Sequence, residues 1–172
     1  MSFRLYTIII IFFCFFSCSR SKEQNNQGSR PGKDEMADLN RYFVQKDVER
    51  IQNYSERKNL KMTESPTGLW YFIKKEGSGE FITDHDHILM EYDCSLLDGT
   101  LCYTSKNQGP KNIVLGKSQL EAGLDEGMRM LKKGSEATFI LPPFLAYGLI
   151  GDGKKIPPRA IIVYNVRILP SN

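Results

Sequence analysis

The residues best suited to chemistry lie in the segment LPPFLAYGLIGDGKKIPP, residues 141–158, which holds four of the chain's eight prolines. A proline pair precedes Tyr147, and Pro157 and Pro158 close the glycine-containing loop that follows it. Because proline fixes φ at about −65°, both ends of this segment are stiffened. A hydroxyl held there can bond a ligand with little loss of conformational entropy. The segment predicts a binding site at Tyr147, and a packed tyrosine with a purely structural role is the alternative.

Other signatures of catalysis are missing from the sequence. No glycine-rich phosphate loop follows a strand, and no Gly-x-Ser-x-Gly elbow is present. His85 and His87, the two histidines, share one strand face, but two ligands do not close a metal site. We therefore interpret them as a solvated start of a strand, and we expect no metal and no cofactor. The net charge is +3 without a long basic block, which argues against nucleic-acid binding.

The first residues predict export. An apolar run over residues 5–16 follows Arg4, and it is too short to span a bilayer comfortably. It ends in Phe-Phe-Ser-Cys and resembles a bacterial lipoprotein signal, which implies removal of residues 1–17 and lipidation of Cys18. A plain signal peptide or an N-terminal membrane anchor is the alternative. We expect the protein in the cell envelope, lipid-anchored in the outer membrane and facing the periplasm, because Ser19 resembles an outer-membrane sorting signal.

A tether and a helix are predicted next. Residues 18–34 lack large apolar side chains after the cysteine, so they cannot bury enough surface to offset the entropy of ordering. Over residues 35–60, apolar side chains recur at spacings of three to five, which indicates an amphipathic helix. This helix packs on its own domain, or it binds a partner or forms a homodimer.

From residue 66 to 172 the pattern changes to strands. Apolar and aromatic runs over 69–76, 87–97, 112–116, 136–142 and 160–169 predict strands, and Asp98-Gly99 predicts a hairpin. Residues 118–134 predict a short helix with a capping box of Ser118 and Glu121, with Lys132 and Lys133 in its last turn. The fold class expected is α+β, an antiparallel sheet with a helix against one face. Cys94 and Cys102 flank the hairpin and are candidates for a disulfide.

Residues 68–169 resemble an FKBP-type peptidyl-prolyl isomerase domain. The resemblance is carried by EYDCSLLDGTLCYTS, by VLGKSQLEAGLDEGMRMLKKGSEATFILPPFLAYG and by IPPRAIIVYNVRIL. It implies a half-barrel of antiparallel strands wrapped on the short helix, with an apolar pocket between them. The signal, the helix and TESPTGLWY (63–71) are similar to the gliding-motility-associated branch of lipid-anchored FKBPs.

The resemblance also implies a set of site residues. Catalytic positions match Tyr147, Tyr92, Tyr103 and Leu124, and substrate contacts match Cys102, Leu120, Glu121, Ile156 and Tyr164. Tyr147 matches the tyrosine whose hydroxyl bonds the bound carbonyl. Cys102-Tyr103 replaces a Phe-Asp pair, and Glu121 places a charge at the pocket rim.

The implied activity is cis–trans isomerisation of X–Pro bonds, which needs no acid, base or nucleophile. The implied partners are proline-containing unfolded or exported polypeptides. Because the pocket is altered, we expect weaker turnover than in a family member with the full pocket. The alternative is an FKBP-fold chaperone or binding module with little isomerase activity.

Overall fold

The computed structural model describes residues 32–170, and its first element is helix α2, Lys33–Arg57. The predicted signal peptide at residues 1–17, Cys18 and most of the predicted tether lie outside the described residues. Asp34 and Glu35 occupy the first turn of α2 and Arg57 its last, where each charge complements the helix dipole. The helix expected over 35–60 is therefore present with nearly the predicted bounds.

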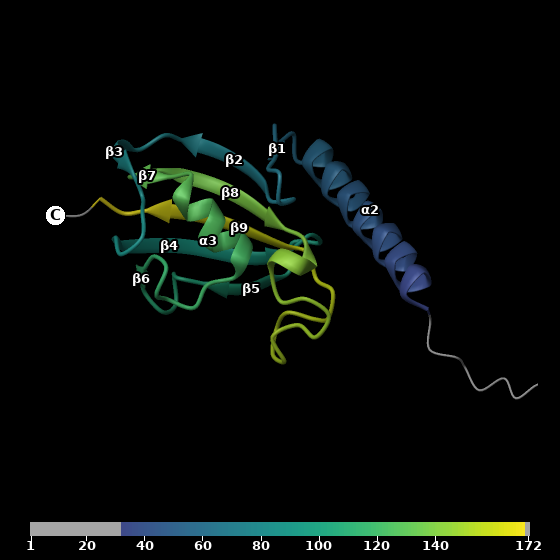
Figure 1. Ribbon diagram of the computed structural model, residues 1–172. Helices are drawn as coiled ribbons and strands as arrows, with labels where there is room; N and C mark the ends of the chain where they lie inside the picture. Colours follow the sequence, from purple (N-terminus) through teal and green to yellow (C-terminus); the bar gives the residue numbers. More distant parts are fainter. Residues whose placement is uncertain (1–31, 171–172) are drawn as a thin grey trace, which may run out of the picture. The chain divides into compact units, whose positions relative to one another are not determined.

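Within residues 32–170, seven strands form one antiparallel sheet in the order β1-β2-β8-β9-β4-β5, with β6 also paired to β4 (Figure 1). These strands are β1 Thr63–Glu64, β2 Trp70–Lys75, β4 His87–Leu96, β5 Leu101–Thr104, β6 Lys111–Val114, β8 Glu136–Leu141 and β9 Ile162–Ile168. A separate two-stranded sheet pairs β3, Ser78–Phe81, with β7, Lys132–Lys133. The predicted α+β class is confirmed, and Asp98-Gly99 forms the expected turn between β4 and β5.

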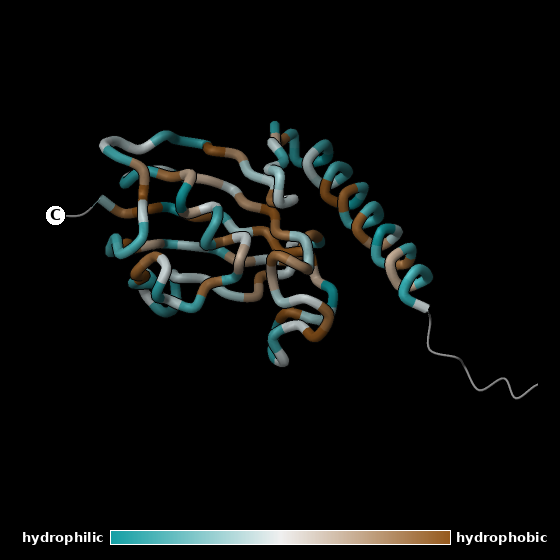
Figure 2. The backbone as a smooth tube through the Cα atoms, in the orientation of Figure 1, coloured by the Kyte–Doolittle hydropathy of each residue, from teal (hydrophilic) through white to brown (hydrophobic). Residues whose placement is uncertain are grey.

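The central strands are apolar along their inner face and, at one end only, on their outer face. Along β9, Tyr164, Val166 and Ile168 belong to the main core, whereas Val163 belongs to a second apolar cluster. Successive side chains of a strand point to opposite faces, so the two clusters lie on opposite sides of the sheet. Figure 2 shows hydrophobic residues recurring along these strands. One strand thus supports both the pocket side and the α2 side of the domain.

Helix α3, Ala122–Arg129, packs against the main-core face of the sheet. Its two interior glycines make the close approach to β8 feasible. A Cβ added at Gly127 would lie 2.8 Å from the ring of Phe139, and one added at Gly123 would lie 2.7 Å from Leu141. Glycine is used here because any side chain would push the helix off the sheet. The short distance between α3 and β8 sets where the first turn of α3 meets the pocket.

From Asp38 the described chain forms one compact unit, and α2 packs on the second apolar cluster. Ile51 of α2 is fully buried there against Trp70, Ile140, Ile161 and Val163. The helix therefore packs on its own domain, as one of the two sequence interpretations held.

Two details of the helix prediction are wrong. α3 ends at Arg129, and Lys132 and Lys133 lie in β7 rather than in a last helical turn. The predicted capping box is also not formed. The Ser118 hydroxyl accepts the backbone N–H of Val114 at 2.9 Å, and Glu121 is the N-cap residue without a side-chain cap bond. The Glu121 side chain turns into the pocket instead.

Candidate functional site

A hollow of about 170 Å³ lies where β4, β5, β9 and the first turn of α3 face the segment after β8. Its lining residues come from separate parts of the chain; they are Met90, Tyr92, Tyr103, Lys111, Glu121, Leu124, Tyr147 and Tyr164. Leu124 of α3 is 1% exposed and provides apolar floor. Four of the eight are tyrosines and one is a glutamate, so oxygen atoms face a hollow that also has apolar walls at Met90 and Leu124, which suits a peptide ligand.

The strand pleat aims two of the tyrosines into this hollow. Met90 and Tyr92 are two residues apart on β4, so they share a face. Tyr164 stands on the neighbouring strand β9, opposite Cys94. The rings of Tyr92 and Tyr164 lie 6.1 Å apart between centroids and are tilted by 50°. These two rings make a wall whose position is fixed by the sheet.

Tyr147 is positioned by bonds on both sides of it. It follows the 3₁₀ turn η1, Pro143–Leu145, and the backbone N–H of Gly148 donates to the carbonyl of Pro143 at 2.8 Å. The carbonyl of Gly148 accepts from the N–H of Arg159 at 3.0 Å. The ring is therefore held between the proline pair before it and the proline pair after the loop. The prolines at both ends of residues 141–158 thus restrict the backbone on either side of Tyr147.

The Tyr147 hydroxyl donates to the carboxylate of Glu121. The Tyr164 hydroxyl donates to the same oxygen, Oε1, at 2.9 Å. Burial raises the pKa of Tyr147, and the bond to Glu121 raises that pKa further. Burial and the nearby Glu121 charge also raise the pKa of Tyr164. Both hydroxyls consequently stay protonated and act as donors.

The second oxygen of Glu121 has no partner. Oε2 is buried and bonds none of the described residues. A buried carboxylate oxygen without a hydrogen bond is costly, and such atoms call for an explanation. The sequence placed the charge of Glu121 at the pocket rim. In the structure its carboxylate lies inside the pocket.

The loop after Tyr147 is organised by Asp152. The Tyr103 hydroxyl donates to Oδ2 of Asp152, which joins β5 to the loop. The other oxygen, Oδ1, accepts the backbone N–H groups of Lys154 and Ile156 at 2.8 Å each. Tyr103 thus closes one side of the pocket through the loop.

A family model described as FKBP-type peptidyl-prolyl cis-trans isomerase matches residues 78–169, slightly more than half of the chain. The chain belongs to the FKBP family. It is similar to a protein of Neisseria meningitidis named "Probable FKBP-type peptidyl-prolyl cis-trans isomerase FkpA", with 40% identity over 120 residues. That match covers 69% of this chain and 43% of the relative. It is also 40% identical over 85 residues to human peptidyl-prolyl cis-trans isomerase FKBP9, covering 49% of this chain and 15% of the relative.

Solved structures agree with the FKBP fold. The crystal structure of AtFKBP13 superposes with a TM-score of 0.61 at 26% identity, covering 65% of this chain and 99% of that one. The crystal structure of FkpA from Escherichia coli gives a TM-score of 0.63 at 24% identity, covering 96% of this chain and 79% of that one. This FKBP chain spans less than half the length of the two curated relatives.

The structure brings most of the predicted site residues of this FKBP together. Six line the hollow: Tyr92, Tyr103, Glu121, Leu124, Tyr147 and Tyr164. Three lie beside it instead of on its surface. Leu120 is partly buried against the core, and Cys102 and Ile156 are buried within the core itself.

Three residues of the site were not predicted from the sequence. Met90 lines the pocket, and its spacing of two from Tyr92 could have indicated it. Lys111 lines the pocket from β6. Asp152 carried no signal, because its bond to Tyr103 joins residues that are distant in the sequence.

Cys94 and Cys102 are free thiols, so the disulfide suggested from the sequence is not formed in the structure. The strand register explains the difference. Cys94 faces Tyr103, and a bulge in the β4–β5 pairing leaves Cys102 without a direct partner across the ladder. Burial raises the pKa of Cys94 to about 12, which keeps this thiol protonated.

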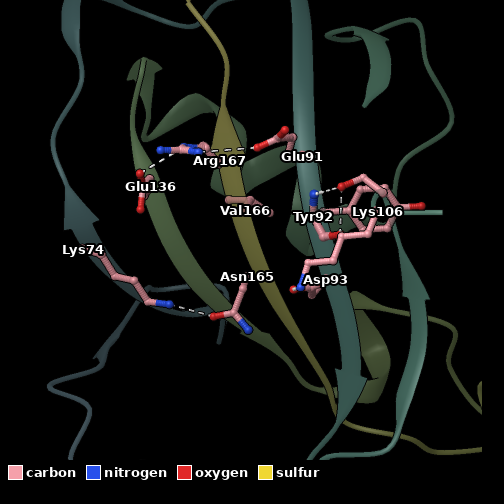
Figure 3. A pocket seen from close by; sticks show the side chains of 10 residues that line it. Lys74, Glu91, Tyr92, Asp93, Lys106, Glu136, Asn165, Val166 and Arg167 are labelled. Atoms are coloured by element: carbon pink, nitrogen blue, oxygen red, sulfur yellow. Dashed lines mark hydrogen bonds and ion pairs between the residues drawn. The ribbon is translucent and has the colours of Figure 1, made fainter. Parts of the chain in front are cut away.

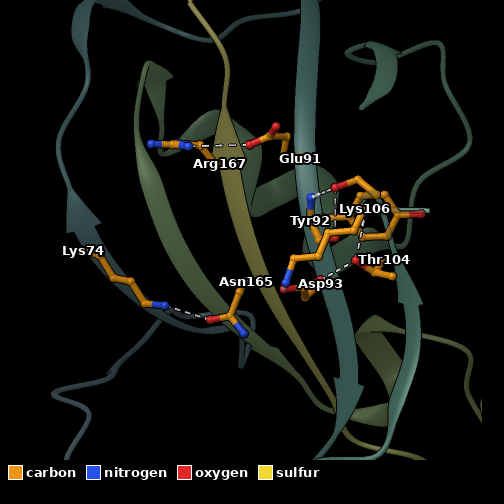
Figure 4. Close-up of polar contacts among 9 residues, drawn as sticks. Lys74, Glu91, Tyr92, Asp93, Thr104, Lys106, Asn165 and Arg167 are labelled. Carbon is orange, nitrogen blue, oxygen red and sulfur yellow. Dashed lines mark hydrogen bonds and ion pairs between the residues drawn. The ribbon is translucent and has the colours of Figure 1, made fainter. Parts of the chain in front are cut away.

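A second hollow, of about 320 Å³, lies on the other face of the sheet (Figure 3). Its charged groups contact one another or a neutral amide. Arg167 contacts Glu91 at 3.7 Å and Glu136 at 3.1 Å (Figure 3). Lys74 donates to Asn165 at 2.8 Å (Figure 4). Pairs of this kind on an open surface contribute little energy. We interpret this hollow as the solvated outer face of the sheet.

Among residues 32–170, no group of three or more His, Cys, Asp or Glu side chains is arranged to hold a metal ion. None of the helices in this described part is long and apolar enough to cross a membrane. His87 is the first residue of β4, but His85 lies in the turn before it with a positive φ of 72°, so the two histidines do not share a strand face as the sequence predicted.

Proposed function

We propose that this chain catalyses cis–trans isomerisation of X–Pro bonds in exported or envelope polypeptides. One observation carries the proposal. This chain, a member of the FKBP family, presents the Tyr147 hydroxyl as a fixed, protonated donor inside a small pocket whose floor is Leu124. An X–Pro peptide places one carbonyl and one apolar ring side by side, and this pocket offers a donor beside an apolar surface. The proline ring occupies the apolar floor, and the Tyr147 hydroxyl orients the peptide through its carbonyl.

The mechanism follows from amide resonance. Rotation about the planar bond has a barrier of about 18–20 kcal/mol, because twisting removes the partial double bond. Water bonded to the carbonyl oxygen favours the planar, charge-separated form. A pocket that excludes this water and fits the twisted amide better than the planar one lowers the barrier. An acceleration of about 10⁴ requires about 5–6 kcal/mol of such preferential binding.

Conformational exchange between the cis and trans forms of an Ala–Pro peptide, measured by NMR with the full chain, tests the activity. We expect broadened or exchanging proline signals whose rate scales with protein concentration. A folded chain that leaves the uncatalysed rate unchanged contradicts the proposal.

A second candidate function is an FKBP-fold chaperone or binding module with little turnover. It is favoured by three exposed apolar side chains around the Tyr147 segment: Phe144 is 53% exposed, Leu149 72% and Ile150 83%. Exposed apolar groups of this size beside a pocket can hold unfolded chains regardless of proline. Suppression of aggregation of a proline-free client, without acceleration of X–Pro exchange, would support this candidate.

We propose further that Cys18 carries a lipid and anchors the protein in the outer membrane, facing the periplasm. The support is the apolar run that ends in Ser-Cys before a polar tether. Labelling of cells with palmitate should mark the wild-type chain and the Cys14→Ser variant, and it should not mark Cys18→Ser. Equal labelling of Cys18→Ser and wild type contradicts the anchor. A place in the gliding-motility-associated branch is proposed from the lipoprotein signal, the helix before the domain and TESPTGLWY.

A homodimer through residues 35–60 is also proposed. Leu39 and Tyr42 of α2 are exposed, and they form an apolar surface on the part of the helix that Ile51 does not anchor. Cross-linking of the full chain should give a dimer that a Leu39→Glu, Tyr42→Glu double variant loses. An unchanged cross-linked dimer in that variant would place the contact elsewhere.

A further inference from the structure

Glu121 already occupies the hydrogen-bonding position of the pocket. Its Oε1 accepts the hydroxyls of both Tyr147 and Tyr164, and the Tyr147 hydroxyl is the donor assigned to a bound peptide carbonyl. A substrate must therefore displace this carboxylate from Tyr147 or bind beside it. Either way the carboxylate stays close to the pocket, because α3 begins at the next residue and fixes the Glu121 backbone there.

The unpartnered oxygen indicates what kind of group the carboxylate accepts. Oε2 is buried and bonds no described residue, and Lys111, a cation that also lines the pocket, is exposed and is not bonded to it. Desolvated carboxylate oxygens are best satisfied by charged donors. An ammonium or guanidinium group arriving with the peptide would supply such a donor and would also compensate the buried charge.

The position of that cation on the peptide follows from the same bond. If the Tyr147 hydroxyl takes the X–Pro carbonyl, the side chain of X begins one atom from that carbonyl. It is then the peptide side chain nearest to Glu121. A long, flexible lysine or arginine at X can lay its aliphatic part along the pocket wall and present its charge to Oε2.

We propose that Glu121 is a specificity-determining residue, which selects X–Pro segments with Lys or Arg at X and disfavours those with an acidic X. This inference rests on the proposed X–Pro binding function. It goes further than that function because it names the class of segment and the atom that recognises it. A partly buried ion pair of this kind gives a preference of about five- to ten-fold.

The test uses the full chain in detergent and three peptides that differ at X: Ala-Lys-Pro-Phe, its norleucine analogue and its glutamate analogue. Norleucine keeps the aliphatic chain of lysine and removes the charge. NMR exchange gives kcat/KM for each peptide, and titration of peptide signals gives Kd. The variants are Glu121→Gln, which keeps the shape, and Glu121→Thr as a second neutral side chain should the first fold poorly. Glu91→Gln is the matched control, because it removes one charge from the opposite face of the sheet.

For the wild type, kcat/KM should be higher for the lysine peptide than for the norleucine peptide, and added salt should reduce this difference. The kcat/KM of the glutamate peptide should be lower still. In Glu121→Gln or Glu121→Thr the ratio should fall to about one, whereas Glu91→Gln should keep it. A wild-type ratio near one overturns the proposal. The proposal is also overturned if a neutral Glu121 variant raises kcat/KM for all three peptides by the same factor, since the carboxylate would then only obstruct the pocket.

The two levels of inference fail separately. If the wild type turns over none of the peptides but binds the lysine peptide more tightly through Glu121, the selectivity stands and the isomerase function fails. If it turns over all three equally, the isomerase function stands and the selectivity fails. Absence of both turnover and binding overturns both.

Discussion

The guanidinium of Arg159 donates to the carboxylate of Asp47 at 3.0 Å, which joins helix α2 to the segment that closes the pocket. The same guanidinium lies 4.0 Å from the ring centroid of Phe43. Asp47 is 5% exposed, so its charge depends on this partner and on Arg50 at 3.5 Å. Because the N–H of Arg159 also bonds Gly148, the residue after Tyr147, α2 supports the pocket loop from behind.

Replacing Arg159 with glutamine should therefore destabilise the protein. The change leaves the Asp47 carboxylate buried with one distant partner, and about 1–2 kcal/mol of unfolding free energy should be lost. Urea denaturation measures it. Arg167→Gln is the control, because its ion pairs lie on the exposed outer face and should cost less than about 0.5 kcal/mol. Equal losses in the two variants would show that the Asp47 contact does not stabilise the domain.

Much of the fold was predictable because its strands carry strong local signals. The apolar runs at 69–76 and 87–97 and the Asp98-Gly99 turn all became the expected elements. The end of α3 was not predictable. Lys132 and Lys133 suit a last helical turn by charge, but pairing with β3 holds them in β7. Tertiary pairing overrode the local preference there.

The site was predictable where family motifs fix backbone positions and unpredictable where side chains choose their partners. Tyr92, Leu124 and Tyr147 line the pocket as expected. The inward turn of Glu121 could not be predicted, because its sequence context equally suited a capping box. The Tyr103–Asp152 bond depends on how a loop folds back over β5, and no local pattern encodes that.

Leu124→Ala should open a cavity in the pocket floor. The side chain is 1% exposed and packs in the main core, so its truncation should cost about 2–4 kcal/mol of unfolding free energy. The exposed Leu149 offers the matched change, and Leu149→Ala should cost less than about 0.5 kcal/mol. Thermal unfolding followed by circular dichroism compares them. A small cost at Leu124 would mean that the floor collapses around the missing atoms.

Gly151→Ala should disrupt the loop that Asp152 organises. Gly151 has a φ of +74°, and a Cβ there would lie 2.2 Å from the carbonyl oxygen of Ile156. Gly153 has a φ of +70° with open space around it, so Gly153→Ala carries the backbone strain of about 1 kcal/mol without the clash. We expect a shifted Ile156 amide signal and reduced X–Pro exchange in the first variant, and a near-native spectrum in the second. Matching spectra in the two variants would contradict the clash.

Tyr147→Phe should lower kcat/KM for X–Pro exchange several-fold. The variant keeps the ring and removes one hydrogen bond to the peptide, which is worth about 0.5–1.5 kcal/mol. Tyr164→Phe is the control, because the Tyr164 hydroxyl donates to the same Glu121 oxygen but is not the donor assigned to substrate. It should change the rate less than about two-fold. Full activity in Tyr147→Phe would remove that hydroxyl from the mechanism.

Acid should loosen the pocket loop through Asp152. Burial raises the pKa of this carboxyl, but bonds from the Tyr103 hydroxyl and from backbone N–H groups outweigh it and lower the pKa to about 2. A carboxyl with a depressed pKa in the folded state contributes stability that is present above its ordinary pKa of about 3.8 and is lost as the pH falls through the folded value. The difference in unfolding free energy between wild type and Asp152→Asn should therefore be constant from about pH 7 to 5 and should shrink between about pH 5 and 2.

Tyr103→Phe separates the hydroxyl from the rest of this arrangement. Removing that donor should raise the pKa of Asp152 toward its ordinary value, so the loss of stability in acid should begin at a higher pH than in wild type. Asp98 is a suitable comparison, since backbone bonding within the β4–β5 turn lowers its pKa without any contact to Tyr103. The carboxyl signals of both residues can be followed by NMR during an acid titration. If Tyr103→Phe leaves the Asp152 titration where it was, the backbone N–H groups alone hold the carboxylate, and β5 does not control the loop.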